Sequence, residues 1–493
     1  MNLVNDVTEE RIVDFKTGLN IVPSRDDRMT DFAKKLITDY YLKDGESIQE
    51  GLARASFAWC DKDFSLAQRI YDAVSKGWFM FASPVLSNAP EVIDRENFIF
   101  KNQTSMPISC FGSYVDDSLT GLIENSSETR WLSVKGGGVG IDISKVRSAG
   151  KMTPGPIPFI CTYDTDMEAY KQGKVRRGSV AVYMDVSHPD VFEFLNLRVP
   201  TGDASRKCHS AGFHNAINIS DSFMEAVEKD ADWDLVDPHD KGVRKTVSAR
   251  KLWDQILDVR YRTGEPYLHF SDTSNRALPF AQKEIGLKIN NTNLCSEIFL
   301  PNGPDRTFVC CLSSLNVEKF DEWKDTSLVR DLIRMLENVL EYFIKIAPST
   351  IEKAKYSAMR ERALGLGVMG FHYYLQRNNV PFESQIAREL NIKLFKHIHD
   401  EAIIATKELG IEKGECPDFI TDLTFTLYDG NKVVVKSSDY VGIVDPNNEF
   451  SSIPLNVRAF QVVPGNTIII NGYTSRVEII EGKHPHTGWR NAS

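Results

Sequence analysis

The feature that most constrains the fold is a change of sequence pattern near residue 83. The residues before it read as helices with short loops, for example Met29–Tyr41, where apolar positions recur at spacings of three and four. From there to about residue 220, short apolar runs alternate with Gly, Pro, Asn and Asp, which is typical of strands and loops. Two amphipathic helices follow, one beginning near Ser327 and one running from a Ser384 N-cap to Gly410 as C-cap. This alternation predicts an α/β fold.

The pattern changes again after Cys416. Leu423–Lys436 contains two runs with period-two alternation around an Asp-Gly turn, which is a strong hairpin signal. A similar segment begins at Pro464. A chain of 493 residues allows roughly three domains at about 150 residues each. We therefore expect a helical region over 1–80, an α/β region over 81–415 and a β-rich appendage, either all-β or loosely ordered, over 416–493.

Charge and composition exclude several classes of protein. The chain has 58 Lys and Arg against 68 Asp and Glu, a net charge of −10, so no overall basic field exists to hold a nucleic acid, although a local anion pocket remains possible. No apolar run is long enough to span a bilayer, and the N-terminus is charged from Asp6 onward, unlike a secretion signal. Eight cysteines without zinc-type spacing indicate neither a disulfide scaffold nor a structural metal site. We expect a cytoplasmic protein in a reducing compartment.

The most informative short segment is Asn293-Leu-Cys-Ser-Glu297. In extended backbone, residues two apart point the same way, so Asn293, Cys295 and Glu297 would project together. They would supply a hydrogen-bonding amide, a sulfur centre and a general base. Taken alone, the segment is more often a loop with one buried cysteine, because a free cysteine is commonly a small core residue.

Two further segments favour a functional role for Asn293–Glu297 over a loop with one buried cysteine. Val309–Asn316 reads V-C-C-L-S-S-L-N, and Ser105–Leu119 contains S-C followed after six residues by D-S-L. With N-L-C-S-E these form, in order, motifs of one family: the chain resembles the catalytic large subunit of class I ribonucleotide reductase over roughly residues 70–415. The resemblance implies part of that family's ten-stranded α/β barrel with its finger loop, joined to the N-terminal helical region and the β-rich appendage.

The resemblance also implies catalytic roles. Cys295 matches the finger-loop cysteine that becomes a thiyl radical and takes the 3′-hydrogen of the ribose. Glu297 matches the carboxylate that takes the 3′-hydroxyl proton, and Asn293 matches the amide that hydrogen-bonds the substrate. The implied activity is the reduction of ribonucleoside diphosphates to deoxyribonucleotides for DNA synthesis.

A pair of cysteines would supply the electrons. Cys110 and Cys310 match the two thiols that reduce C2′ and close as a disulfide, a two-electron reaction open to thiols that can reach bonding distance. Cys311 fills a neighbouring position that is not a cysteine in the family pattern. We interpret it as structural, but the sequence leaves open which of Cys310 and Cys311 is redox-active.

Four further positions match substrate-binding sites of the family. Ser83 aligns with a hydroxyl residue on the substrate-binding strand, Ser109 with the serine beside the first redox cysteine, and Gly138 with a glycine whose backbone approaches the nucleotide. Arg176 would face the substrate from Gly173–Ser179, a loop that links the effector and substrate sites. Without the resemblance, the glycine run would be read as a flexible strand connection, and the basic cluster as solvated surface.

A separate site would bind an allosteric effector. Asp117, Ser118 and Arg147 match positions that hold a deoxynucleoside triphosphate or ATP, together with Mg²⁺. A carboxylate for ribose hydroxyls and a guanidinium for phosphate are suitable groups. Lys151–Pro154 lacks a second arginine that some relatives have there, which leaves the effector's identity open.

Several family elements are missing from the sequence. We find no P-T-A-S-type phosphate loop, no late tyrosine dyad, no C-terminal cysteine pair and no ATP-cone motif. Thr487–Ser493 faintly resembles what would follow the interrupted region. We therefore expect one piece of a split, phage-type catalytic subunit. Its expected partners are a second chain with the C-terminal half, a small subunit holding the radical cofactor, thioredoxin or glutaredoxin, and a second copy of the composite subunit in a dimer.

Three alternatives remain from the sequence. The first is a cobalamin-dependent reductase of the same superfamily, which a requirement for adenosylcobalamin would reveal. The second is a catalytically inactive nucleotide-binding or scaffold remnant, which the intact Cys295 and Glu297 disfavour. The third is an intein half that starts at Cys416, which the lack of splicing-block motifs disfavours.

Overall fold

The computed structural model describes residues 9–102, 105–170, 177–199, 207–444, 455–470, 473–483 and 487–491. The N-terminal part is helical, as predicted, and α1 begins after the Thr30 cap, whose Oγ1 accepts a hydrogen bond from the Ala33 amide. Ser47 and Glu50 form a capping box at the start of α2. The elements here are β1 (Ile12–Val13), β2 (Asn20–Ile21), η1 (Pro23–Arg28), α1 (Asp31–Tyr40), α2 (Ile48–Ala58), α3 (Phe64–Ser75), β4 (Val92–Asp94) and β5 (Ile99–Phe100).

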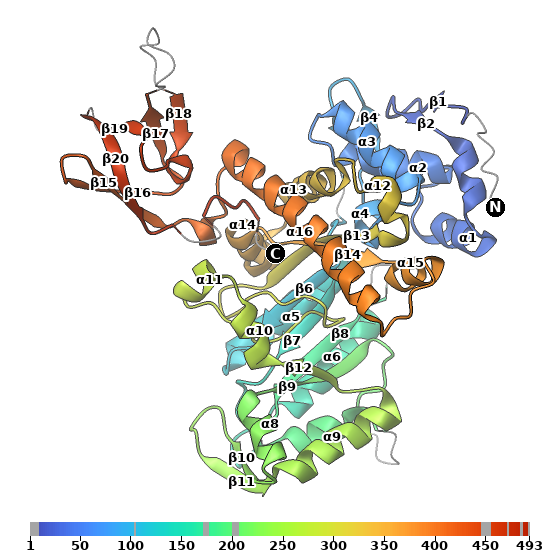
Figure 1. The fold of residues 1–493 in the computed structure, drawn as a ribbon. Helices are drawn as coiled ribbons and strands as arrows, with labels where there is room; N and C mark the ends of the chain where they lie inside the picture. Colours follow the sequence, from blue (N-terminus) through green and yellow to red (C-terminus); the bar gives the residue numbers. More distant parts are fainter. Residues whose placement is uncertain are drawn as a thin grey trace.

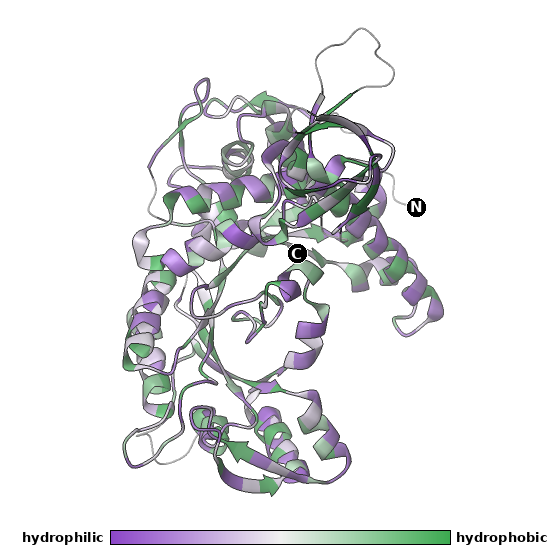
Figure 2. Ribbon diagram, turned by 90° about the vertical axis from the view of Figure 1, so that its left-hand side faces the viewer, coloured by the Kyte–Doolittle hydropathy of each residue, from purple (hydrophilic) through white to green (hydrophobic). Residues whose placement is uncertain are grey.

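Within the described residues, eight strands form one sheet in the order β12-β9-β8-β7-β6-β13-β14, with β3 on the same β13 strand. The strands from β6 to β12 are parallel, whereas β6 and β13 run antiparallel. The sheet curls into an open half-barrel (Figures 1 and 2). Its strands are β3 (Phe79–Phe81), β6 (Cys110–Tyr114), β7 (Gly138–Asp142), β8 (Val180–Asp185), β9 (Phe213–Ile219), β12 (Tyr267–Phe270), β13 (Phe308–Asn316) and β14 (Leu364–Met369).

Helices connect these parallel strands and cover the sheet, and β10 (Asp232–Val236) pairs with β11 (Val243–Ser248) at one end. The long helix α13 buries the predicted apolar face, including Leu332, Leu336 and Leu340, in the main core. The helices are α4 (Ser83–Ser87), α5 (Leu119–Val134), α6 (Ile157–Ala169), α7 (Val191–Leu195), η2 (Asn196–Arg198), α8 (Asp221–Glu228), α9 (Ala249–Thr263), α10 (Ser271–Ala277), α11 (Phe280–Glu284), η3 (Val317–Lys319), α12 (Phe320–Trp323), α13 (Leu328–Ile346), η4 (Ser349–Ile351), α14 (Glu352–Glu361), α15 (Phe371–Arg377) and α16 (Gln385–Lys413).

The end of α16 differs from the sequence prediction. Ser384 is the N-cap, as predicted, but the helix continues through Gly410 to Lys413 and is capped by Gly414. The glycine at 410 has another role: a Cβ there would lie 1.9 Å from the carbonyl oxygen of Gly488. Gly410 is therefore needed for the close approach of a distant segment, not for capping.

The strands after residue 420 form a separate unit (Figure 1). Within the described residues they make a six-stranded sheet in the order β16-β15-β20-β19-β17-β18 around its own apolar cluster, which includes Leu423, Phe425 and Val477. The predicted hairpin corresponds to β15 and β16, which are antiparallel. We call residues 422–481 the β-module; its elements are β15 (Asp422–Leu427), β16 (Lys432–Lys436), β17 (Tyr440–Ile443), β18 (Leu455–Arg458), η6 (Ala459–Gln461), β19 (Thr467–Ile470) and β20 (Tyr473–Glu481), preceded by η5 (Pro417–Phe419).

The chain returns to the main body after the β-module. The Cys416 amide donates to the carbonyl oxygen of Trp489 at 3.0 Å, and the Gly488 amide donates to Glu415 at 2.6 Å. The two ends of the β-module therefore lie side by side. Over the described residues, no helix combines the length and the apolar character needed to cross a bilayer.

Candidate active site

The finger loop, residues 285–307, joins α11 to β13 and lies on the inner face of β7. Two glycines of β7 make this approach possible, because a Cβ at Gly140 would lie 1.9 Å from the Thr292 carbonyl oxygen and one at Gly138 would lie 2.5 Å from Leu294. Gly138 and Gly140, from the run that alone would be read as a flexible connection, thus belong to a buried strand against which the loop packs.

The expectation that Asn293, Cys295 and Glu297 lie in extended backbone is wrong. The Ser296 amide donates to the Asn293 carbonyl oxygen at 3.3 Å, and Ser296 has a φ of +65°, so the segment is a tight turn. The Asn293 side-chain oxygen accepts hydrogen bonds from the Glu297 and Ile298 amides at 3.1 and 3.0 Å. The turn, and not strand alternation, brings the three residues together.

Glu297 is the centre of this arrangement. Asn293 Nδ2 donates to Glu297 Oε2 at 2.7 Å, and Cys110 Sγ lies 3.9 Å from Glu297 Oε1. Cys295 is exposed in the same turn, close enough to Cys110 for a charge on its sulfur to raise the pKa of Cys110. The amide, the carboxylate and two of the predicted sulfur centres therefore share one site.

Strand register distinguishes the two candidates for the second redox cysteine. Cys310 of β13 lies directly opposite Cys110 of β6 in an antiparallel pair, where opposed side chains share one face of the sheet and approach closely. Cys311 points to the other face, with its Sγ 3.6 Å from the Leu336 carbonyl oxygen of α13. The geometry thus favours Cys310 over Cys311 as the partner of Cys110.

Both thiols of this pair are held in the protonated form. Burial, with a smaller contribution from the Glu297 carboxylate, raises the pKa of Cys110 to about 11. Burial also raises the pKa of Cys310 well above its ordinary value, and the neighbouring Cys110 adds to that shift. At neutral pH the two sulfurs therefore carry hydrogen and can act as hydrogen and electron donors.

Tyr183, on the inner face of β8, anchors the turn and was not singled out from the sequence. Its hydroxyl lies 2.5 Å from Thr292 Oγ1 and 2.8 Å from Ser296 Oγ, and it donates to the Asn293 carbonyl oxygen at 2.9 Å. Burial raises the pKa of Tyr183 to about 12, so the hydroxyl stays protonated. Because the residue sits in an ordinary apolar strand pattern, V-A-V-Y-M-D, no local signal marks it.

The predicted substrate residues occupy different positions around this site. Ser109 is buried directly before β6, and its carbonyl oxygen accepts from the Gly138 amide at 2.8 Å. Ser83 is the first residue of α4 and not part of a strand, but it follows Phe81, which pairs with Ser313 on the strand that carries Cys310. Arg176 lies outside the described residues.

A cavity of about 440 Å³ opens beside the pair of thiols. Glu297 and Cys310 line it together with Leu364 and Gly365 of β14, and its remaining walls are mostly apolar. The cavity is large enough to receive a nucleoside next to the reacting groups. Over the described residues, no group of three or more His, Cys, Asp or Glu side chains is arranged to hold a metal ion.

The predicted effector residues meet at one end of the sheet. Arg147 Nε donates to both oxygens of Asp117 at 3.1 Å, and the Arg147 amide also donates to Asp117 at 3.0 Å. Burial opposes ionisation of Asp117, but these hydrogen bonds hold its pKa below the ordinary value. Ser118 caps α5, its Oγ accepting from the Gly121 amide at 2.9 Å.

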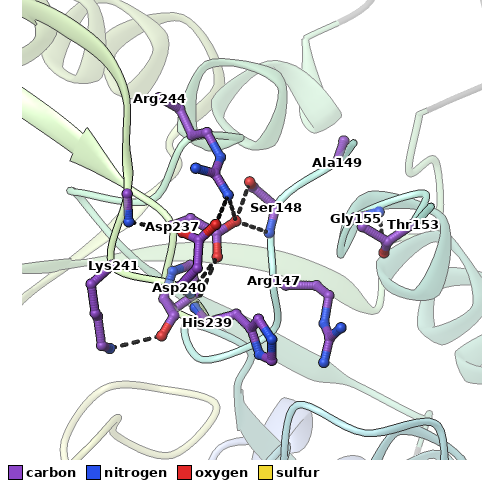
Figure 3. Close-up of polar contacts among 12 residues, drawn as sticks. Arg147, Ser148, Ala149, Thr153, Gly155, Asp237, His239, Asp240, Lys241 and Arg244 are labelled. Carbon is purple, nitrogen blue, oxygen red and sulfur yellow. Dashed lines mark hydrogen bonds and ion pairs between the residues drawn. The ribbon is translucent and has the colours of Figure 1, made fainter. Parts of the chain in front are cut away.

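Two residues at this end were missed by sequence reasoning. His239 Nδ1 lies 2.9 Å from Asp117 Oδ2. Figure 3 shows the His239 side chain beside that of Arg147. Asp237 fixes the turn that carries His239, because it accepts hydrogen bonds from the Ser148 amide and hydroxyl and from the His239 amide. These bonds outweigh burial and lower the pKa of Asp237 to about 2. Nothing in the local sequence relates residues 237–239 to Asp117, more than a hundred positions earlier.

Comparison with known proteins agrees with this geometry. The ribonucleotide reductase barrel domain matches residues 108–433, and the family's all-alpha domain matches residues 29–92. A protein of frog virus 3 carries the provisional name ribonucleoside-diphosphate reductase large subunit. It is 46% identical over 393 residues, which are 79% of this chain and 66% of that protein. The ribonucleoside-diphosphate reductase large subunit of Invertebrate iridescent virus 3 is 35% identical over 516 residues, 93% of this chain and 79% of that protein.

A solved structure supports the same assignment. The class Id ribonucleotide reductase alpha subunit of Actinobacillus ureae superposes with a TM-score of 0.68 at 30% identity, covering 79% of this chain and 69% of that one. The chain thus spans about two thirds of the length of the frog virus protein and of this alpha subunit. With the barrel-domain match over more than half of its residues, the chain belongs to the ribonucleotide reductase large-subunit family.

Proposed function

We propose that this chain is the catalytic part of a ribonucleoside-diphosphate reductase. One observation carries the proposal: Cys110 and Cys310 face each other across adjacent strands, beneath a turn that presents Glu297 and Cys295. A pair of opposed thiols next to a carboxylate is suited to two-electron reduction coupled to proton transfer.

Each of these groups has a defined role in the reaction. The Cys295 sulfur, as a thiyl radical, takes the hydrogen atom from C3′ of the ribose, and Glu297 accepts the 3′-hydroxyl proton. The 2′-hydroxyl leaves as water while Cys110 and Cys310 supply two hydrogens and close as a disulfide. Glu297 then returns its proton to the 3′-oxygen, and Cys295 returns its hydrogen to C3′. In sum, one ribonucleotide and two thiols give one deoxyribonucleotide, one disulfide and one water.

Protonated thiols are what this step requires. Because burial raises the pKa of Cys110 to about 11, this sulfur retains its hydrogen at neutral pH until the substrate arrives. Asn293 holds Glu297 by a 2.7 Å hydrogen bond and so fixes the base beside the thiol. Ser109, Gly138 and Ser83 would border the nucleotide, and Arg176 would face it from its loop.

Other components would complete the enzyme. A radical cofactor held by a separate small subunit would supply the one-electron oxidation of Cys295, and thioredoxin or glutaredoxin would reduce the disulfide. A deoxynucleoside triphosphate or ATP, with Mg²⁺, would bind at Asp117, Ser118 and Arg147. The exposed apolar side chains Leu119 and Ile123 of α5 support association of two copies.

The half-barrel has an open strand edge at β14. Among the described strands, β14 pairs only with β13, and its other side borders the cavity that holds Glu297 and Cys310. An open strand edge beside an apolar cavity favours pairing with further strands. We infer that further strands pair with this edge of β14; in the split arrangement proposed from the family resemblance, a separate polypeptide would supply them.

Turnover of a ribonucleoside diphosphate tests the proposal. The chain is assayed alone and with a polypeptide that supplies the remaining barrel, a radical-generating small subunit and a dithiol. We expect deoxyribonucleotide only from the complete mixture. No product from that mixture contradicts the reductase proposal, activity of the lone chain contradicts the split arrangement, and activity that needs adenosylcobalamin favours the cobalamin-dependent alternative.

Two adjacent variants sharpen the test. Cys310→Ser is expected to abolish both repeated turnover and the Cys110–Cys310 disulfide, whereas Cys311→Ser, on the opposite face of β13, is expected to retain both. Peptide mapping under non-reducing conditions after a single turnover reports the disulfide. A Cys110–Cys311 cross-link in Cys310→Ser, with no cross-link to Cys110 in Cys311→Ser, would reverse the assignment of the redox pair.

A further inference from the structure

A second pair of cysteines lies outside the active site, between α6 and the segment that leads into β9. Three residues on one face of α6, at positions 161, 164 and 168, contact three consecutive residues of that segment. Asp164 accepts hydrogen bonds from the His209 and Ser210 amides at 3.0 and 2.8 Å. The Ser210 hydroxyl donates to Glu168 at 2.9 Å. This ladder fixes the segment along the helix.

Cys161 and Cys208 form the first contact of the same ladder. The two thiols lie within hydrogen-bonding reach, and the hydrogen bond to Cys161 raises the pKa of Cys208. The backbone of Cys208 is also fixed, because its amide donates to the Leu197 carbonyl oxygen at 3.1 Å and its own carbonyl accepts from Arg198 at 3.3 Å. Cys208 is 2% exposed, whereas Cys161 is only partly buried.

We propose that Cys161 and Cys208 form a regulatory disulfide when the protein meets a low-molecular-weight disulfide such as oxidised glutathione. The thiolate of the more accessible Cys161 attacks one sulfur of the oxidant and releases one thiol. The Cys208 sulfur then attacks Cys161 in the mixed disulfide, releases a second thiol and completes the Cys161–Cys208 bond. Two protein thiols are oxidised and one small disulfide is reduced to two thiols.

A disulfide at this position would restrict the segment that leads into β9. The segment after Cys208 reaches Gly212 directly before β9, where a Cβ would lie 2.2 Å from the Gly178 carbonyl oxygen. Arg177 and Ser179 share a cavity of about 360 Å³ with Ser210 and Met167 of α6. A bond between Cys161 and Cys208 would restrict this segment where it touches residues 177–179, which end the loop that by family resemblance links the effector and substrate sites.

The test uses the whole chain and an internal reference. The protein is incubated with oxidised glutathione, digested under non-reducing conditions and mapped by mass spectrometry. We expect a peptide linking Cys161 to Cys208 in addition to one linking Cys110 to Cys310. Hydrogen exchange of the Ser210–Gly212 amides is expected to slow at least about threefold on oxidation, and to recover with dithiothreitol.

Matched variants separate the two pairs. Cys161→Ser should lose the first cross-link and the change in exchange while keeping Cys110–Cys310, and Cys60→Ser, which alters a buried cysteine in another part of the fold, should keep both. The proposal is overturned if the Cys110–Cys310 peptide forms and the Cys161–Cys208 peptide does not. If the Cys161–Cys208 peptide forms and the Cys110–Cys310 peptide does not, the result contradicts the reductase function and supports this inference.

Discussion

At the scale of single residues, the position of the catalytic turn depends on Tyr183. We expect Tyr183→Phe to remove three polar contacts to the finger loop and to lower the free energy of unfolding by about 1–3 kcal/mol, because the loop's carbonyl and hydroxyl groups lose a buried partner. Turnover should fall at least about tenfold, since the turn that carries Cys295 loses its anchor.

Tyr163→Phe is the matched control for this change. Tyr163 of α6 is also buried, and its hydroxyl donates to Asn125 of α5 at 2.7 Å, so this bond joins two helices and does not involve the finger loop. Urea unfolding should show a similar loss of stability in both variants, but only Tyr183→Phe should lose activity and show faster hydrogen exchange at 292–298. Equal turnover in the two variants would mean that Tyr183 serves the core alone.

A second residue-scale prediction concerns the reactivity of Cys110. Its pKa of about 11 leaves roughly 0.1% thiolate at pH 8, against about a quarter for an unperturbed thiol. Alkylation of Cys110 by iodoacetamide should therefore be slow at pH 8 and rise about tenfold per pH unit up to about pH 11. Quantitative mass spectrometry of the labelled peptide measures this, with urea-denatured protein as the control. Rapid labelling of folded protein at pH 8 would show that Glu297 and burial do not keep the sulfur protonated.

At the scale of elements, the close packing of the finger loop on β7 depends on glycines in that strand. Gly140→Ala would place a Cβ 1.9 Å from the Thr292 carbonyl oxygen, so the loop must move away from the strand. Since a displacement of about 1 Å at a reacting group can reduce turnover about 100-fold, we expect a loss of that order. The Cys110–Cys310 disulfide, which depends on β6 and β13 only, should still form.

Gly150→Ala is the control for Gly140→Ala, because the nearest atom to its new Cβ lies 4.0 Å away. Circular dichroism and thermal unfolding establish that both variants fold, and turnover then distinguishes them. Full activity of Gly140→Ala would show that the finger loop tolerates displacement from β7.

The same elements show where sequence reasoning succeeds and where it cannot. Periodicity and local chemistry were sufficient for α13, for the Ser384 cap of α16 and for the β15–β16 hairpin, because those signals lie within a few residues of each other. Gly410 was read as a helix cap, yet its role is set by Gly488, 78 positions later. Its true role is a long-range packing requirement that no local pattern contains.

The candidate active site also combines features that the sequence motifs reveal with features that only long-range contacts determine. The family resemblance singled out Cys295, Glu297 and Cys110 as candidates, but the turn that unites the first two depends on Tyr183 and on the glycines of β7. Strand register was needed to separate Cys310 from Cys311, since adjacent residues differ only in the face to which they point.

At the scale of the whole molecule, the β-module lies between two segments that pack against each other. Glu415 accepts hydrogen bonds from Ser437 and from the Gly488 amide, and so ties the start of the β-module to its end. The returning segment then enters the main body, where Asn491 Nδ2 donates to Glu337 at 2.6 Å. The β-module therefore has the geometry of an insertion, and the main body continues on its far side.

Arg490 is the residue on which this return depends. Glu337 is fully buried, and although burial opposes its ionisation, Arg362 and Arg490 hold its pKa below the ordinary value. Arg490→Met would leave that carboxylate with only one of its two arginines, so we expect the free energy of unfolding to fall by about 3–5 kcal/mol. Arg476→Met, which alters an exposed arginine of β20, should change it by less than about 0.5 kcal/mol. Urea denaturation followed by tryptophan fluorescence compares the two variants, and equal stabilities would show that residues 488–491 do not hold the main body together.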